Sequence, residues 1–222
     1  MYQRYDSNPR PITRVGAMPA QSLLAQVLGL TAVGFLITAA GAYLSWGIPV
    51  GLANLAFFVG FFLIFGIHAS RENPGRALAF FYAFTACEGV GLAPMLSRYI
   101  STFGPDIVVN AAATTGFGMA ILAAVVYTTS FDFRRLQGIA FIGLMVLIVA
   151  GLVSMFVHFL HPETYAWGTL VVFTLWTLID FARIRAGGDA ATPVELAVEI
   201  YLDALNLFIA LLQIFGLRSR ED

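Results

Sequence analysis

The chain has 222 residues, of which 59% are hydrophobic and 11% charged, and its formal net charge is −1. Globular domains typically carry about 25% charged residues, so this composition excludes an ordinary soluble domain. The near-zero net charge also gives no basis for nucleic-acid binding. A mean hydropathy of +0.82 indicates an integral membrane protein instead.

The chain begins with a polar tail, residues 1–19, which we expect to be disordered and cytoplasmic. The first apolar stretch follows this tail and is too long for a signal-peptide core. Each later apolar stretch is also close to the roughly 20 residues with which a helix crosses a bilayer, and alternating barrel strands are absent. The seven predicted spans are 20–44, 48–69, 77–97, 107–130, 137–160, 165–183 and 194–217.

These spans predict an all-α membrane protein with a single seven-helix domain over residues 20–217 and a short tail at 218–222. All twelve basic residues are arginines. If the N-terminus is cytoplasmic, nine of the twelve lie on the cytoplasmic side, as the positive-inside rule requires, and the C-terminus lies outside. The cytoplasmic set is Arg4, Arg10, Arg14, Arg71, Arg76, Arg134, Arg135, Arg183 and Arg185; the outer set is Arg98, Arg218 and Arg220.

The last predicted span has one polar stripe on an otherwise apolar helix. Glu195, Glu199 and Asp203 are spaced by four residues, and Asn206 and Gln213 continue the row at the spacing of one helical face. A carboxylate at the centre of an isolated spanning helix costs about 2.5–3.5 kcal/mol on insertion scales. The stripe is therefore expected to face other helices or water, while Glu195, in the first turn, is read as an acid favoured by the helix dipole.

Asp180 provides a partner at the same depth. The turn between the last two spans is centred near residue 191 or 192, and Asp180 and Asp203 lie about equally far from it. Adjacent antiparallel helices would then bring the two carboxyl groups to one level. Spacing alone leaves open whether they meet or each bonds a separate hydroxyl group.

A meeting of Asp180 and Asp203 would have chemical consequences. Two nearby carboxylates do not both ionise cheaply, so the pair would keep a proton and titrate as one unit. Loss of that proton would create repulsion and an oxygen-rich site of the type that Ca²⁺ prefers. The pattern therefore fits a proton-controlled cation gate.

Two further charged residues could act on such a gate. Arg71 lies at the cytoplasmic end of the second span and could reach a carboxylate there, or it could simply be a solvated anchor. Glu88 in the third span could face the same cavity, or it could be a protonated side chain satisfied by a neighbouring helix.

The sequence lacks the residues that several known classes of membrane protein and enzyme require. A retinal protein needs a lysine for its Schiff base, and the chain contains none. Zinc-protease, P-loop and dinucleotide motifs are absent, and the contexts "LIDFA" and "YLDAL" do not match the Gly-x-Gly-Asp pattern of intramembrane aspartyl proteases. His158 and His161, beside Glu163, are too few for a typical zinc site. We therefore expect a protein that is not an enzyme.

The chain resembles the transmembrane Bax-inhibitor motif family, including its bacterial members. The segment "EIYLDALNLFIALLQIFG" is similar to the family's closing helix, "EGVGLAPML" to its third-helix motif, and "YTTSFDFRRLQG" to the segment after its fourth helix. The aspartate of the sixth span also matches in position, and the likeness covers nearly the whole chain.

The resemblance implies a bundle in which the seventh helix is central and wrapped by the other six. It also implies a pH-sensitive calcium leak channel of the bacterial inner membrane, in which Asp180 and Asp203 sense protons and gate the path, with Ca²⁺ as permeant or bound ion and no other cofactor. Arg71 matches the position of the family's latch arginine. Glu88, Glu199 and Asn206 would line the path or support the pair.

The sequence departs from the family pattern at the closing helix. Gln213 stands where an arginine is usual, and Ala204 where a bulky phenylalanine is usual. Some bacterial relatives modulate a membrane-bound protease, so the rival expectation is a membrane protein that binds and regulates such a protease or another membrane complex.

Overall fold

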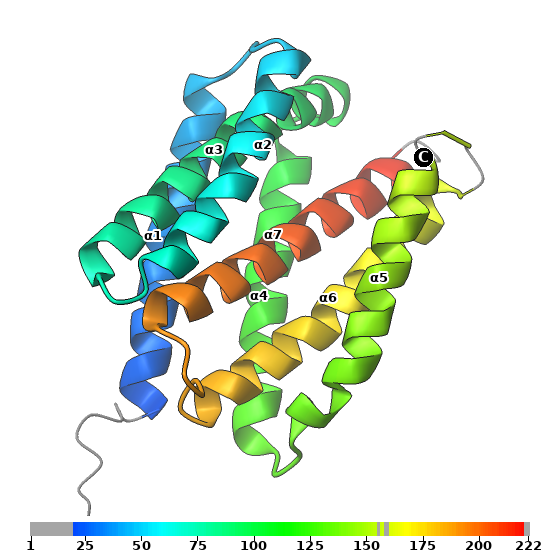
Figure 1. The fold of residues 1–222 in the computed structure, drawn as a ribbon. Helices are drawn as coiled ribbons and strands as arrows, with labels where there is room; N and C mark the ends of the chain where they lie inside the picture. The colour runs from blue at the N-terminus through cyan, green and yellow to red at the C-terminus, as the bar shows by residue number, and fades with distance from the viewer. Residues whose placement is uncertain (1–19, 155, 158–159, 220–222) are drawn as a thin grey trace, which may run out of the picture.

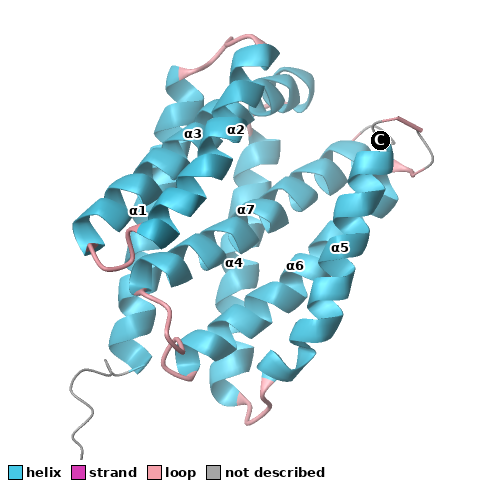
Figure 2. Ribbon diagram, viewed as in Figure 1, coloured by secondary structure: helices cyan, strands magenta, loops and turns pink. Residues whose placement is uncertain are grey.

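The computed structural model describes residues 20–154, 156–157 and 160–219. The tail predicted for residues 1–19, His158 of the weak histidine pair and the last three residues of the chain lie outside the described residues. Within the described ranges the chain folds into seven long helices and one short 3-10 helix, with no strand (Figure 2). The predicted all-α fold with seven membrane-spanning helices is confirmed.

The helices follow one another with short connections (Figure 1). Their bounds are α1 Ala20–Leu44, α2 Val50–Ala69, α3 Pro74–Phe103, α4 Asp106–Thr128, η1 Phe133–Leu136, α5 Gln137–Ser154, α6 Pro162–Arg185 and α7 Pro193–Arg218.

Local sequence explains where the helices differ from the predicted spans. Helix α3 starts three residues earlier than the predicted 77–97 because the Asn73 side chain accepts a hydrogen bond from the Arg76 amide and Pro74 occupies the first turn. It also continues beyond the predicted end to Phe103, through a polar segment that hydropathy alone does not include. The helix stops at Gly104, whose φ of 85° favours glycine.

The start of α7 is the most strongly specified helix terminus. The Thr192 hydroxyl accepts from the Glu195 amide, and the Glu195 carboxylate accepts from the Thr192 amide in return. This reciprocal capping box, with Pro193 in the first turn, fixes where the helix begins. It thereby sets the depth of every residue on the polar stripe of α7.

Helix α7 lies at the centre of the packing. It contacts α1, α2, α3, α4 and α6, whereas α5 packs chiefly against α6 and η1 (Figure 1). Close approach elsewhere depends on small residues: a Cβ added at Gly89 of α3 would collide with the carbonyl oxygen of Thr38 on α1. The side chains of α7 are mostly buried, so its polar stripe is enclosed by protein rather than lipid.

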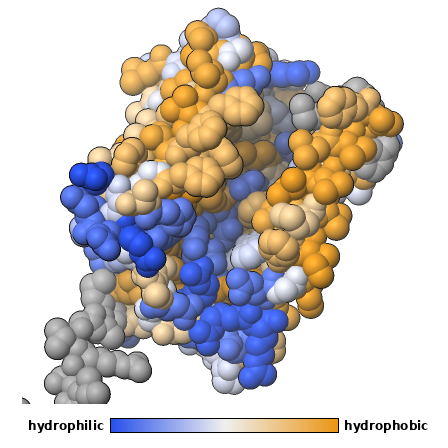
Figure 3. All heavy atoms as spheres, in the orientation of Figure 1, coloured by the Kyte–Doolittle hydropathy of each residue, from blue (hydrophilic) through white to orange (hydrophobic). Residues whose placement is uncertain are grey.

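The outer surface matches a lipid environment. Large apolar side chains such as Phe58, Phe62 and Ile142 are exposed on the flanking helices. Figure 3 shows hydrophobic residues along the α2 and α5 sides and hydrophilic residues gathered around the end where α6 stops and α7 starts. That end carries the residues predicted to form the gate.

Candidate functional site: a buried aspartate pair

The two predicted gate residues come together. Asp180 on α6 and Asp203 on α7 are 3% and 5% exposed, and their carboxyl groups are close enough to interact. The nearby hydroxyl of Thr177, one turn before Asp180 on α6, donates to the Phe173 carbonyl of its own helix.

Hydrogen bonding around the pair is incomplete. Within the described part of the chain, Oδ1 of Asp180 and Oδ2 of Asp203 are buried without a hydrogen-bond partner. An ionised carboxylate in such surroundings is strongly disfavoured. The geometry therefore suits a pair that holds at least one proton. Because the two carboxyl groups come from different helices, that proton would influence how closely α6 and α7 pack.

The cation that reaches the pair is Arg183. Its guanidinium Nη1 lies 2.6 Å from Oε2 of Glu199 and 3.8 Å from Oδ1 of Asp180. The first distance is a charge-assisted hydrogen bond, whereas the second is an ion pair beyond hydrogen-bond length. Arg183 thus links Glu199 on α7 to Asp180 on its own helix.

This ion network extends into the loop between α6 and α7. Asp189 lies 3.6 Å from Nε of Arg183 and 3.5 Å from Nη1 of Arg134. Its φ of 53° is a left-handed conformation that aspartate tolerates better than most residues. Arg134 in turn pairs with Asp132, and this guanidinium holds the pKa of the Asp132 carboxyl below its usual range.

Arg71, in the turn between α2 and α3, contacts the same loop, because its Nη2 donates a 2.7 Å hydrogen bond to the Ala190 carbonyl. Among the described residues it forms no ion pair with either aspartate. Nearby, Nδ1 of His68 lies 3.1 Å from Oε1 of Glu195. Glu195 is therefore in the first turn, as the sequence suggests, and also completes the capping box and contacts α2.

The remaining predicted site residues lie apart from the pair. The carboxyl group of Glu88 faces α2, where a Cβ added at Gly60 would lie 3.2 Å from its Oε1. Asn206 donates its side-chain amide to the Leu202 carbonyl of its own helix at 2.7 Å. It also lines a cavity of about 290 Å³ between α5, α6 and α7, one turn beyond Asp203.

A resident metal ion does not fit this donor set. Ca²⁺ takes six to eight oxygen ligands, typically from several carboxylates. The described residues contain no group of three or more His, Cys, Asp or Glu side chains that could hold a metal ion. Glu199, the nearest further acid, is already engaged by Arg183.

Two features of the site were missed by sequence reasoning. Arg183 is three residues after Asp180 on one helix, a spacing that allows an ion pair without specifying it. The second is a buried hydroxyl contact of 2.7 Å between Tyr201 and Thr38, whose Oγ1 also donates to the Thr85 carbonyl. This contact ties α7 to α1 and α3 at a point between Glu199 and Asp203.

The structure is that of a polytopic membrane protein with seven spanning helices and a buried acid pair. Comparison with known proteins identifies the family. Residues 20–220 match the family described as Inhibitor of apoptosis-promoting Bax1, and the chain belongs to this family. The predicted resemblance is therefore confirmed.

Individual relatives support this assignment. A Helicobacter pylori protein is 31% identical over 159 residues, covering 71% of this chain and 69% of its own length. Bax inhibitor 1 of Schizosaccharomyces pombe is 30% identical over 171 residues, covering 76% of this chain and 62% of its own length. The modulator of FtsH protease YccA from Escherichia coli is 28% identical, with 72% of each chain covered.

Proposed function

We propose that this protein is a pH-sensitive leak for Ca²⁺ or related cations in the bacterial inner membrane, gated by Asp180 and Asp203. At acid pH the two carboxyl groups share a proton and hold α6 against α7. As pH rises the pair loses this proton, the carboxylates repel each other, and an acidic passage opens between the helices. In this role the protein carries out no chemical reaction and needs no cofactor.

The observation that carries this proposal is the contact of two buried carboxyl groups from adjacent helices, each with an oxygen lacking a partner among the described residues. Buried acids inside membrane proteins commonly mark proton or ion pathways. A purely structural contact between helices would be expected to satisfy its polar atoms.

The other charged residues have supporting roles in the proposal. Arg71 acts as a latch by holding the loop that joins the two acid-bearing helices, through the Ala190 carbonyl. Glu199 keeps Arg183 near the pair, while Asn206 and Glu88 serve a permeating cation further along the bundle. Arginine placement supports a cytoplasmic N-terminus and an external C-terminus, so the pair would titrate from the cytoplasmic side.

A flux assay tests the proposal. Purified protein is reconstituted into vesicles that contain a Ca²⁺ indicator, and Ca²⁺ entry is measured from acid to mildly alkaline pH. The wild type should conduct more as pH rises, and Asp180→Asn or Asp203→Asn should remove this dependence because an amide does not titrate. The exposed residue Asp106 offers a matched control, since Asp106→Asn should leave the profile unchanged. Absence of flux, or an unchanged profile in both pair variants, would refute the gate.

One comparison favours a second candidate function, because a relative is a modulator of the membrane protease FtsH. Under this alternative the protein binds and regulates a membrane protease or another membrane complex, and the aspartates serve helix packing. Mild-detergent purification from the native membrane should then recover a protease in a fixed stoichiometry. Recovery of the chain alone, together with pH-dependent flux, would reject this alternative.

A further inference from the structure

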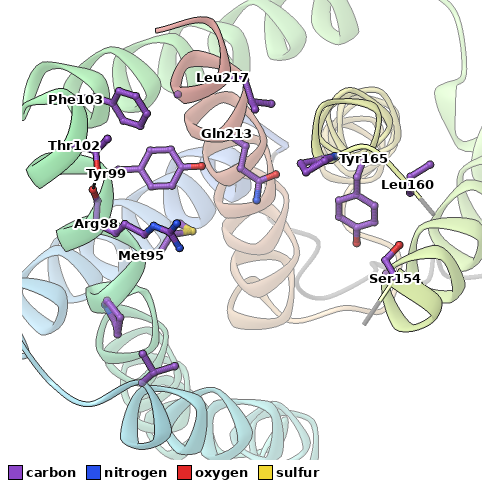
Figure 4. A pocket seen from close by; sticks show the side chains of 15 residues that line it. Met95, Arg98, Tyr99, Thr102, Phe103, Ser154, Leu160, Tyr165, Gln213 and Leu217 are labelled. Atoms are coloured by element: carbon purple, nitrogen blue, oxygen red, sulfur yellow. Dashed lines mark hydrogen bonds between the residues drawn. The ribbon is translucent and has the colours of Figure 1, made fainter. Parts of the chain in front are cut away.

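A second polar region lies at the opposite end of the bundle from the aspartates. There a vestibule of about 790 Å³ opens between α3, α5, α6 and α7 (Figure 4). Gln213 on its α7 wall is ten residues beyond Asp203, or about 15 Å along the helix. Gln213 and Tyr165 also line the smaller cavity that contains Asn206, so the two cavities adjoin.

The lining of the vestibule has an unbalanced charge. Arg98 extends from α3 toward α7 and is its one charged side chain; no aspartate or glutamate is among the described lining residues. No ion pair engages Arg98 in the part of the chain that the structure describes. A basic group without an acid in a walled cavity favours an anion.

Neutral hydrogen-bonding groups lie across the vestibule from Arg98 (Figure 4). Gln213, Ser154 and Tyr165 contribute an amide and two hydroxyl groups from the three other helices. The Ser154 hydroxyl is buried and has no hydrogen-bond partner within the described ranges. Buried hydroxyl groups in native structures usually have a partner, so Ser154 marks a place where a ligand atom could bind.

Much of the remaining wall is apolar, and the vestibule lies where the spanning helices end. Met95, Phe103, Leu160 and Leu217 supply hydrophobic surface next to Arg98. Helix ends at this level face the boundary between hydrocarbon and water. A ligand here can therefore place a charged group on the arginine and apolar groups against the wall.

We propose that this vestibule binds the phosphate group of an anionic amphiphile, with Arg98 as the principal contact and Ser154 and Gln213 as hydrogen-bond donors. The guanidinium fork matches two phosphate oxygens better than a point charge does. The source of the phosphate group is a phospholipid headgroup from the adjacent leaflet, whose chains extend along the apolar wall. This site does not require the protein to conduct cations.

Lipid titrations of the full chain in detergent test the site, with binding followed by native mass spectrometry and by thermal stabilisation. Phosphatidylglycerol should bind the wild type more tightly than the zwitterionic phosphatidylcholine. Arg98→Gln should weaken phosphatidylglycerol binding about tenfold, the loss expected for a hydrogen bond to a charged group, and Arg98→Lys should restore part of it. The matched control is Arg218→Gln, an exposed arginine at the same end but outside the vestibule.

A second variant and a second ligand distinguish the possible results of this experiment. Ser154→Ala provides an independent test should Arg98→Gln not fold, and it is expected to weaken phosphatidylglycerol binding several-fold. If inorganic phosphate binds as tightly as the lipid, the vestibule is an anion site, but its ligand is a free anion and the lipid assignment is wrong. Equal affinity for the two lipids, or unchanged affinity in both Arg98→Gln and Ser154→Ala, would overturn the proposal.

Discussion

Helix α7 passes two polar regions, the acid pair at Asp203 and the vestibule at Gln213, and they differ in burial, charge and partners. The acid pair is enclosed among packed helices, and Arg183 on α6 links it to Asp189 on the loop between α6 and α7. The vestibule is open, and its one cation, Arg98, has no acidic partner in the described lining. Buried acids need a proton or a counter-charge, whereas an arginine at an open rim can remain hydrated.

The two regions therefore differ in electrostatic character: one contains titratable acids and the other a permanently charged arginine. The half around Asp203 contains the buried carboxyl groups that, in the proposed gate, would change charge with pH and move the helices. The half around Gln213 contains a fixed positive charge that attracts anions and opposes cations. A cation entering through the vestibule would therefore meet Arg98 before it reached Asn206 and the pair, so the two regions can be tested separately.

The largest effect is expected at the acid end, from Arg183→Gln. This change leaves Glu199 and Asp180 without their counter-charge. Because Arg183 and Glu199 are 23% and 32% exposed, solvent screening reduces the usual cost of breaking a buried pair to about 1–3 kcal/mol of unfolding free energy. Thermal unfolding in detergent should show this loss.

The same variant also tests whether Arg183 acts on the pair. A positive charge favours ionised carboxylates, so without it the midpoint of the proposed Ca²⁺ flux should move to higher pH. Arg135→Gln, at an exposed arginine near the same end, serves as the control and should change neither quantity. If Arg183→Gln lowers the unfolding temperature but leaves the pH midpoint of the flux unchanged, Arg183 stabilises the fold without acting on the pair.

A smaller effect is expected at the vestibule, from Gly216→Ala. The added Cβ would lie 2.6 Å from Cε1 of Tyr99 and 3.3 Å from Cε2 of Phe103, so the α3 wall would have to shift. We expect a loss of about 1–2 kcal/mol in unfolding free energy and weaker binding of phosphatidylglycerol. The pH profile of flux should stay unchanged because Asp203 lies about 20 Å from Gly216 along the helix.

Gly118→Ala is the matched control for this substitution. No atom lies within 4 Å of a Cβ added at Gly118 on α4, so the change should be neutral or slightly stabilising through helix propensity. If Gly216→Ala moved the pH profile as well, the two ends of α7 would be coupled and the separation drawn above would be wrong.

The two regions also differ in how far the sequence could predict them. Asp180 and Asp203 could be paired because a short loop and a regular helical rise place them at equal depth. Arg183 could not be assigned in the same way, because a long side chain near a helix end can reach water, Asp180 or Glu199 with little change in backbone. The vestibule has no local signal at all, since its polar groups come from four helices.

Helix bounds show the same limit. Hydropathy located all seven spans but ended the third near residue 97, whereas α3 continues to Phe103. That extra length carries Thr102 and Phe103 into the vestibule wall, next to Arg98. Polar residues that face a cavity lower the hydropathy of a segment without ending its helix, so such walls are missed in hydropathy profiles.

The smallest effect is expected next to the acid pair, on the side away from the vestibule, from Tyr201→Phe. This change removes the hydroxyl that lies 2.7 Å from Oγ1 of Thr38 but keeps the ring packed against Phe35 and Phe84. Hydrogen bonds between membrane helices contribute about 0.6 kcal/mol on average, so the unfolding free energy should fall by about 0.5–1 kcal/mol. The midpoint of thermal unfolding in detergent measures the change.

A double-mutant cycle with Thr38→Val identifies the cause. If the hydroxyl contact is responsible, the double variant should lose less than the sum of the two single variants, because both remove the same bond. Thr31→Val is the control, since its bond to the Ala197 carbonyl is long, at 3.4 Å, and should not couple to Tyr201. Strict additivity would mean that the hydroxyl contact does not hold α7 to α1.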